Sequence, residues 1–139
     1  MRALYNISIW GYLIAIHIAA LFNPSAKLWV EGRKNIYQKI KEKLQNSKNI
    51  IWVHCASLGE FEQGRPILEA YKSKHKNHQI LLTFFSPSGF EIKKTTSLAN
   101  WVFYLPIDTQ ANVKKFITLV KPIKVLFIKY EFWFNYMHE

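Results

Sequence analysis

Residues 50–74 read IIWVHCASLGEFEQGRPILEAYKSK, and this stretch decides the fold class. Its first part, 50–56, is an almost unbroken apolar run, which is typical of a strand with both faces covered. Its second part, 60–74, predicts a helix. A buried strand followed at once by a helix is the repeating unit of α/β proteins. We therefore expect a parallel sheet built outward from this strand.

The same order recurs along the rest of the chain. Further strands are predicted at 80–85, 101–106 and 123–130, and further helices at 89–95 and 109–120. Parallel strands need right-handed crossover connections, which these helices supply. The predicted fold class is therefore α/β, with a Rossmann-like parallel sheet over residues 49–139. In such sheets ligands bind beyond the carboxyl ends of the strands, so the loops there are the candidate site.

The N-terminal segment is hydrophobic. Leu4–Phe22 contains no Asp, Glu, Lys or Arg, and as a helix it would be about 28 Å long, nearly the thickness of a bilayer core. We expect residues 1–22 to be a membrane anchor that either spans the bilayer or lies in its interface. A signal peptide and a buried core helix are the alternatives.

A basic stretch follows this segment. Residues 23–48 predict a basic helical connector with an amphipathic helix over 35–45, because Ile36, Tyr37, Ile40 and Leu44 recur at helical spacing. Basic residues beside a membrane segment favour the cytoplasmic side. The expected location is thus the cytoplasmic side of a membrane.

Composition narrows the range of partners. The 139 residues carry a formal net charge of +10, which favours anionic partners, and a single cysteine, Cys55, excludes an internal disulfide. Aromatic residues lie mainly inside the predicted strands and beside no evident basic stripe, so nucleic acid is not an expected partner. Neither a Gly-rich dinucleotide loop nor a P-loop motif occurs, and no metal site or cofactor is predicted.

Glu60 is the acidic residue in the first candidate loop, and two interpretations remain open for it. Ser57-Leu58-Gly59-Glu60 fits the S-x-x-E capping box, in which serine and glutamate each bind the other's backbone N–H. Alternatively, Glu60 is a catalytic base, because it lies at the carboxyl end of a strand. Gly59 beside it would let a substrate approach the backbone closely. The pattern alone does not choose between the two.

Four motifs, in this order, resemble the N-terminal half of bacterial 3-deoxy-D-manno-octulosonic-acid (Kdo) transferases. They are HCASLGEFEQGRPILEAYK, LLTFFSPSGFE, VFYLPIDTQANVKKFI and KYEFWFN, and LFNPSAKLWVEGRKN before them matches as well. The resemblance implies one half of a GT-B glycosyltransferase, with the acceptor held by this N-terminal domain. It implies inverting transfer of Kdo from CMP-Kdo to lipid IVA, an anionic lipid A precursor, in lipopolysaccharide synthesis.

The resemblance also implies roles for residues. Glu60 falls on the family's general base, and Glu131 in KYEFWFN falls on a glutamate that stabilises the transition state. Lys129 and Phe134 depart from the family motif there. The predicted acceptor-binding residues are Ser57, Gly59, Ser86, Ser88, Gly89, Arg33 and Arg65, the two arginines because guanidinium groups bind phosphate oxygens bidentately.

The resemblance leads us to expect a further, C-terminal domain that holds CMP-Kdo and is absent from this chain. By itself the chain is then expected to be inactive, because no second wall closes the cleft around the donor. The alternative prediction is a non-catalytic, membrane-bound module that binds anionic glycolipid.

Overall fold

The computed structural model describes residues 2–129 and 132–139. Its helices are α1 (Arg2–Ala19), α2 (Pro24–Gly32), α3 (Ile36–Lys43), α4 (Leu58–Lys74), α5 (Pro87–Lys93), α6 (Gln110–Val120) and α7 (Phe134–His138). Its strands are β1 (Ile50–Cys55), β2 (Gln79–Phe84), β3 (Trp101–Tyr104) and β4 (Lys124–Phe127). They form one sheet in the order β3-β2-β1-β4, and every pairing is parallel. The predicted α/β class with a parallel sheet is confirmed, and the strand order is consistent with a Rossmann-like fold.

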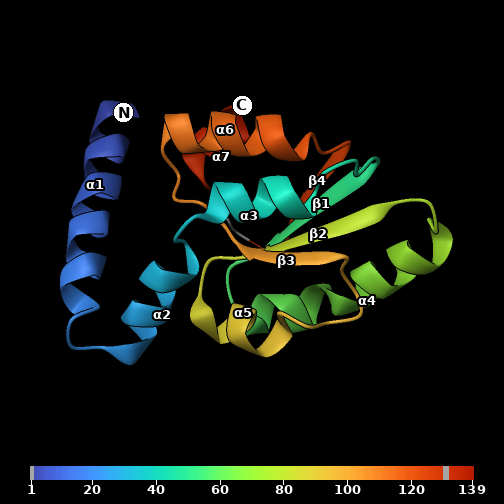
Figure 1. The fold of residues 1–139 in the computed structure, drawn as a ribbon, viewed down its shortest axis with the longest axis horizontal. Helices are drawn as coiled ribbons and strands as arrows, with labels where there is room; N and C mark the ends of the chain where they lie inside the picture. The colour runs from blue at the N-terminus through green and yellow to red at the C-terminus, as the bar shows by residue number, and fades with distance from the viewer. Residues whose placement is uncertain (1, 130–131) are drawn as a thin grey trace.

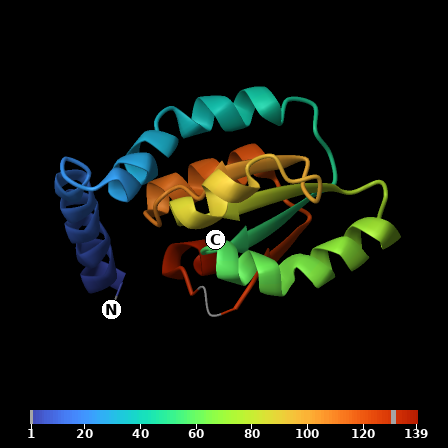
Figure 2. The same ribbon diagram turned by 90° about the horizontal axis from the view of Figure 1, so that it is seen from below.

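Helices cover both faces of this sheet (Figures 1 and 2). Alternate residues of β1 point to opposite faces. Trp52 packs in the layer of α3 and α6, with Phe116 at a ring distance of 4.9 Å, whereas Ile51 and Val53 pack in the layer of α4 with Phe61. This two-sided burial is why β1 and β2 read as apolar runs rather than as alternating sequences.

The stretch 23–48 forms two helices that belong to the folded domain. Asn23 caps α2 by accepting hydrogen bonds from the backbone N–H groups of Ser25 and Ala26, at 2.8 and 3.1 Å. The apolar side of α3, with Ile36, Ile40 and Leu44, is buried in the core beside β3 and α6. The stretch predicted as a connector therefore supplies one of the covering layers.

Helix α1 lies beside the carboxyl ends of the strands (Figure 1). It buries Ile9 against Trp29 of α2 and Ile107, which follows β3. Its other side carries exposed apolar side chains at helical spacing: Leu4, Ile7, Trp10, Ile14 and Ile18. None of the helices among the described residues is both long and apolar enough to cross a membrane. Association of α1 with a membrane stays a prediction.

Strand β4 is an edge strand and is shorter than the predicted 123–130. It pairs with β1 along one side only, and Ile123 and Val125 are exposed. Beyond it the chain leaves the sheet at Lys129, whose φ of 67° is left-handed. Helix α7 lies at the carboxyl edge, where the backbone N–H groups of Asn135 and Tyr136 donate to Asp108 in the loop after β3.

Candidate functional site

The loops after β1 and β2 meet at the carboxyl edge of the sheet. The backbone N–H groups of Phe85 and Ser86 both donate to the carbonyl oxygen of Ala56, at 3.2 and 2.8 Å. This shared acceptor joins the loop that contains Glu60 to the loop that contains Ser88. Two stretches about thirty residues apart in the sequence thus form one surface, as the topology of a parallel sheet requires.

Glu60 forms the predicted capping box at the start of α4. The backbone N–H of Ser57 donates to Glu60 Oε2 at 3.0 Å, and the Ser57 hydroxyl donates to the same oxygen. The Ser57 hydroxyl, backbone N–H groups and the positive charge of Lys129 together lower the pKa of Glu60 below its usual value, although partial burial opposes them. The carboxylate is therefore ionised at neutral pH, fixed at one oxygen and partly open to solvent.

Lys129 is the residue near Glu60 whose importance the sequence did not reveal. It follows β4, which pairs with β1, and its ammonium group interacts electrostatically with the Glu60 carboxylate. Sequence reasoning noted Lys129 only as a departure from the family motif. The strand order, with β4 directly beside β1, was the missing information.

The loop after β2 is a compact helix cap. Ser86 is the N-cap of α5, and its Oγ accepts the Ser88 N–H at 3.2 Å and lies 3.0 Å from the Ser88 Oγ. Ser88 is exposed and Ser86 is half-buried. Both hydroxyls border the surface shared with the Glu60 loop, so the structure brings these two predicted residues toward Glu60.

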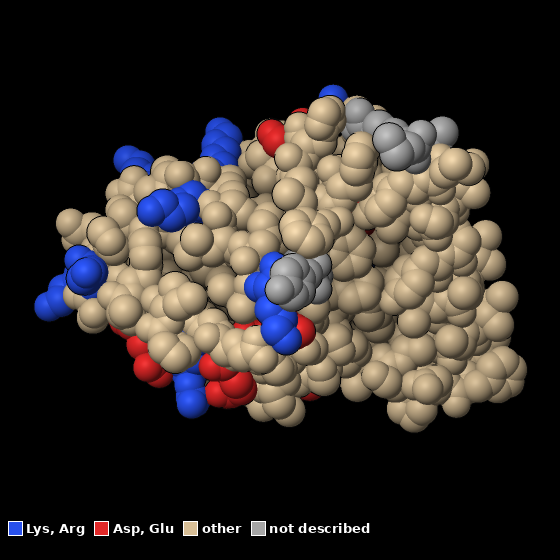
Figure 3. Space-filling view, turned by 180° about the vertical axis from the view of Figure 1, so that it is seen from behind, with Lys and Arg blue, Asp and Glu red and all other residues tan. Residues whose placement is uncertain are grey.

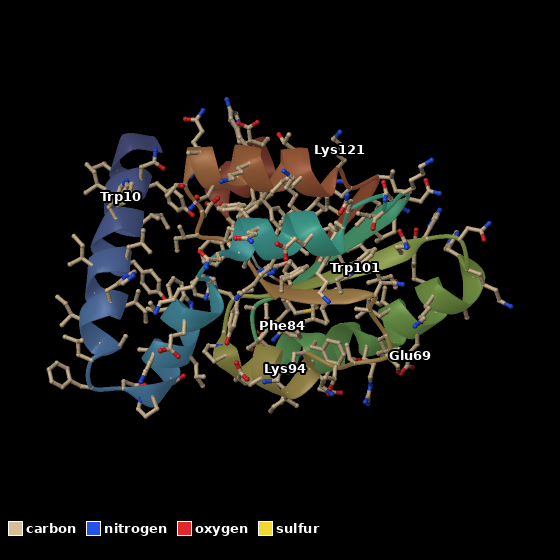
Figure 4. All side chains as sticks on the ribbon, in the orientation of Figure 1. Trp10, Glu69, Phe84, Lys94, Trp101 and Lys121 are labelled. Atoms are coloured by element: carbon tan, nitrogen blue, oxygen red, sulfur yellow. The ribbon has the colours of Figure 1, made fainter. Side chains whose placement is uncertain are left out.

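The two glycines of the site differ in surroundings. A Cβ on Gly59 would meet nothing closer than the Ser57 Oγ, at 3.8 Å. A Cβ on Gly89 would lie 2.2 Å from the ring of Phe84, which is fully buried between the sheet and α5 (Figure 4). The core therefore requires glycine at position 89, whereas packing leaves position 59 open.

Arg33 lies inside the domain, below this surface. Its three guanidinium nitrogens donate to the carbonyl oxygens of Leu105, Trp29 and Phe85 at 2.9–3.0 Å, and the guanidinium stacks 3.7 Å from the Trp29 ring. Desolvation lowers the pKa of Arg33 to about 9, so the group remains a cation at neutral pH. Arg33 joins α2 to the ends of β2 and β3, and phosphate binding by it stays a prediction.

Arg65 lies one turn further along α4 than Glu60 and pairs with its own helix. Its guanidinium lies 3.2 Å from Glu62 and 3.9 Å from Glu69, and the side chain is half exposed. Its predicted contact with phosphate also stays a prediction. Glu131, the predicted transition-state stabiliser, lies outside the described residues. Within the described ranges, no group of three or more His, Cys, Asp or Glu side chains could hold a metal ion.

Comparison with known proteins supplies the context for this surface. Residues 30–139 match the family model described as 3-deoxy-D-manno-octulosonic-acid transferase (kdotransferase). A 3-deoxy-D-manno-octulosonic acid transferase of Aquifex aeolicus is 44% identical over 94 residues, which cover 67% of this chain and 26% of the relative. The Haemophilus influenzae protein of the same name is 30% identical over 90 residues, covering 64% and 21%. That of Chlamydia muridarum is 23% identical over 134 residues, covering 91% and 31%.

Proposed function

Because the chain belongs to the 3-deoxy-D-manno-octulosonic-acid transferase family, we propose that it is the acceptor-binding, base-carrying part of an enzyme that transfers Kdo from CMP-Kdo to the lipid A precursor lipid IVA. The chain spans about a quarter of the length of its relative from Aquifex aeolicus. The proposal therefore concerns a longer protein, in which a further domain holds CMP-Kdo. No metal or cofactor takes part in this proposal.

The observation that carries the proposal is the ionised Glu60 carboxylate at the carboxyl edge of β1. One of its oxygens, Oε2, is held by Ser57, so the other, Oε1, is oriented to accept a proton from an acceptor hydroxyl. That hydroxyl oxygen then attacks the anomeric carbon of Kdo while the bond to CMP breaks, which inverts the configuration. Positioned general bases of this kind contribute about 10²–10⁴-fold to the rate.

The charged neighbours suit anionic substrates. The acceptor carries phosphate and Kdo carries a carboxylate, and the Lys129 ammonium lies close enough to Glu60 to affect its titration. Ser86 and Ser88 offer hydroxyls on the same surface, and Gly59 leaves room for a ligand beside the backbone. Glu131 completes the proposal as the carboxylate that offsets positive charge on the donor sugar.

Ser57→Ala tests the assignment of the base through pH dependence. A base must be deprotonated, so kcat/KM is expected to fall as the pH drops through the pKa of Glu60, which lies below its ordinary value. The Ser57 hydroxyl is the largest cause of that lowering, so its removal should raise the pKa and move the acid limb of the profile to higher pH. A full pH profile of both proteins measures this. An acid limb that does not move would mean that another group titrates.

The membrane surface is the second partner in this proposal. Figure 3 shows that the part of this face where α1 lies is almost free of charged side chains, whereas lysine, arginine and acidic side chains are scattered over the rest of the view. The exposed apolar stripe of α1 fits a helix that lies in the bilayer interface. Such an attachment would place the acceptor site beside the leaflet from which a lipid acceptor comes, on the cytoplasmic side of the inner membrane.

Ile14→Glu tests this attachment. Ile14 is 63% exposed in the middle of the stripe, and burying an isoleucine side chain contributes about 1.5–3 kcal/mol. We expect at least a tenfold loss of binding to vesicles of phosphatidylglycerol and phosphatidylcholine in sedimentation assays, roughly the equivalent of that energy. Ile123→Glu is the matched control, because Ile123 is 57% exposed at the opposite end of the sheet. Equal losses in both variants would contradict the attachment by α1.

A further inference from the structure

Asp108 is a buried carboxylate in the loop between β3 and α6, and only 1% of it is exposed. Three donors bind it. Tyr5 of α1 donates its hydroxyl to Asp108 Oδ2 at 2.5 Å. The backbone N–H of Asn135 donates to the same oxygen at 3.0 Å, and that of Tyr136 donates to Oδ1 at 3.0 Å. No ion pair among the described residues involves Asp108, so these donors provide the hydrogen bonds that its buried oxygens need.

The donors come from opposite ends of the chain. Tyr5 is 103 positions before Asp108, and Asn135 and Tyr136 are 27 and 28 positions after it. Asn135 and Tyr136 lie in the first turn of α7, whose N-cap residue, Trp133, makes no side-chain cap hydrogen bond. The Asp108 carboxylate therefore accepts the hydrogen bonds that an N-cap side chain of α7 would accept. Its Oδ2 also accepts the hydroxyl of Tyr5 in α1.

Further contacts reinforce this junction. The Asn135 side-chain amide donates to the Asp108 carbonyl oxygen at 2.7 Å and to the side-chain oxygen of Asn6 in α1 at 3.2 Å. The rings of Tyr5 and Phe134 pack 5.6 Å apart. Burial and the neighbouring carboxylate of Asp108 raise the pKa of Tyr5, so its hydroxyl stays protonated and remains a donor.

We propose that Asp108 is a positioning residue that ties the seating of α1 on the domain to α7 and to the loops at the carboxyl edge. Trp133, the N-cap residue of α7, packs its ring 4.7 Å from the ring of Phe85. The Phe85 N–H in turn donates to the carbonyl oxygen of Ala56, where the two loops of the candidate site meet. Holding the start of α7 therefore supports the surface around Glu60. This inference rests on the proposed function, because that surface affects a rate only if the protein transfers Kdo. The interfacial helix is then part of the support of the reaction centre as well as an attachment.

Tyr5→Phe separates this role from simple stability, because it removes the link to α1 and leaves both backbone caps of α7 in place. In the complete enzyme we expect kcat to fall by about three- to tenfold, part of what a hydrogen bond to a charged group contributes, with KM for both substrates unchanged. Tyr12→Phe is the matched control. It lies on the same helix, and its hydroxyl has no hydrogen bond among the described residues.

Asp108→Asn should lower kcat by about a hundredfold, because asparagine offers one oxygen for two backbone donors and misplacement of a site by about 1 Å can have that effect. Asp108→Ala has no acceptor for the Tyr5 hydroxyl, so Tyr5→Phe should have no further effect in that background, and the double variant should match Asp108→Ala within about twofold. Independent, multiplying effects of the two substitutions would overturn the proposal, and so would an unchanged kcat in a folded Tyr5→Phe protein.

Hydrogen exchange tests the link without relying on activity. The amides of Asn135 and Tyr136 should exchange about five- to tenfold faster in Tyr5→Phe than in the wild type or Tyr12→Phe, because the shared acceptor is less constrained. Unchanged exchange would show that α1 does not hold α7. A wild-type enzyme that transfers no Kdo would overturn the proposed function instead, while the exchange rates still decide whether Asp108 connects the two helices.

Discussion

Replacement of Glu60 by glutamine is expected to lower Kdo transfer by about 10² or more and to leave the melting temperature almost unchanged. Glutamine cannot take the acceptor proton, so the chemical step loses its base. It can still accept the Ser57 N–H, since glutamine also serves at the third position of a capping box. In this variant the transfer rate should therefore fall while the stability of the fold stays the same.

The measurement is transfer from CMP-Kdo to a lipid A precursor by the complete enzyme, together with circular dichroism and thermal melting. Glu62→Gln is the matched control, because Glu62 lies two positions further along α4 and pairs with Lys93 and Arg65 at 2.7 and 3.2 Å. Its loss is expected to change transfer by less than about threefold, as for an exposed ion pair. Full activity in Glu60→Gln would reduce Glu60 to a helix cap and would remove the basis of the proposed mechanism.

Alanine at the two site glycines is expected to give opposite results. Gly89→Ala should lower the free energy of unfolding by about 1–3 kcal/mol, the usual cost of overpacking, because its Cβ would lie 2.2 Å from the Phe84 ring. That ring is fully buried and packs 5.9 Å from Phe61, so it has no free space to move into. Gly59→Ala should raise the stability slightly, since alanine favours a helix by about 1 kcal/mol over glycine.

Urea unfolding of both variants measures these changes, and transfer assays then assign the roles. Under the proposed function, Gly59→Ala lowers transfer although it stabilises the fold, because the added methyl group occupies the space beside Ser57. Unchanged transfer in Gly59→Ala would exclude close approach of a ligand there. A Gly89→Ala protein as stable as the wild type would contradict the packing described for Phe84.

Local patterns predicted most of the fold. The apolar runs of β1 and β2 are buried on both faces, as an uninterrupted run implies. The S-x-x-E spacing correctly predicted the capping box of Ser57 and Glu60, since that motif depends only on residues within one helical turn. Helix α2 was not predicted as a separate helix, because the sequence of 23–48 is strongly charged. Trp29 of this helix is buried by contacts that exist only in the folded domain.

The site was less predictable, because its determinants are contacts between distant residues. Arg33 resembles a surface arginine in the sequence, but one of its three acceptors lies in α2 and the other two follow β2 and β3, so they surround it only after the sheet forms. Lys129 acquires its relation to Glu60 from the pairing of β4 with β1. Asp108 joins residues more than one hundred positions apart.

The sequence by itself thus determined the α/β class, the capping-box spacing of Ser57 and Glu60, and the family, since each depends on short stretches whose side chains act through local spacing. Only the tertiary structure decided what fills the space around them. It packed Gly89 against the ring of Phe84 and surrounded the Arg33 guanidinium with three carbonyl acceptors. It also left the space beside Gly59 open and placed the Asp108 carboxylate between α1 and α7. These outcomes depend on strand order and on close packing, and neither is encoded within any single stretch.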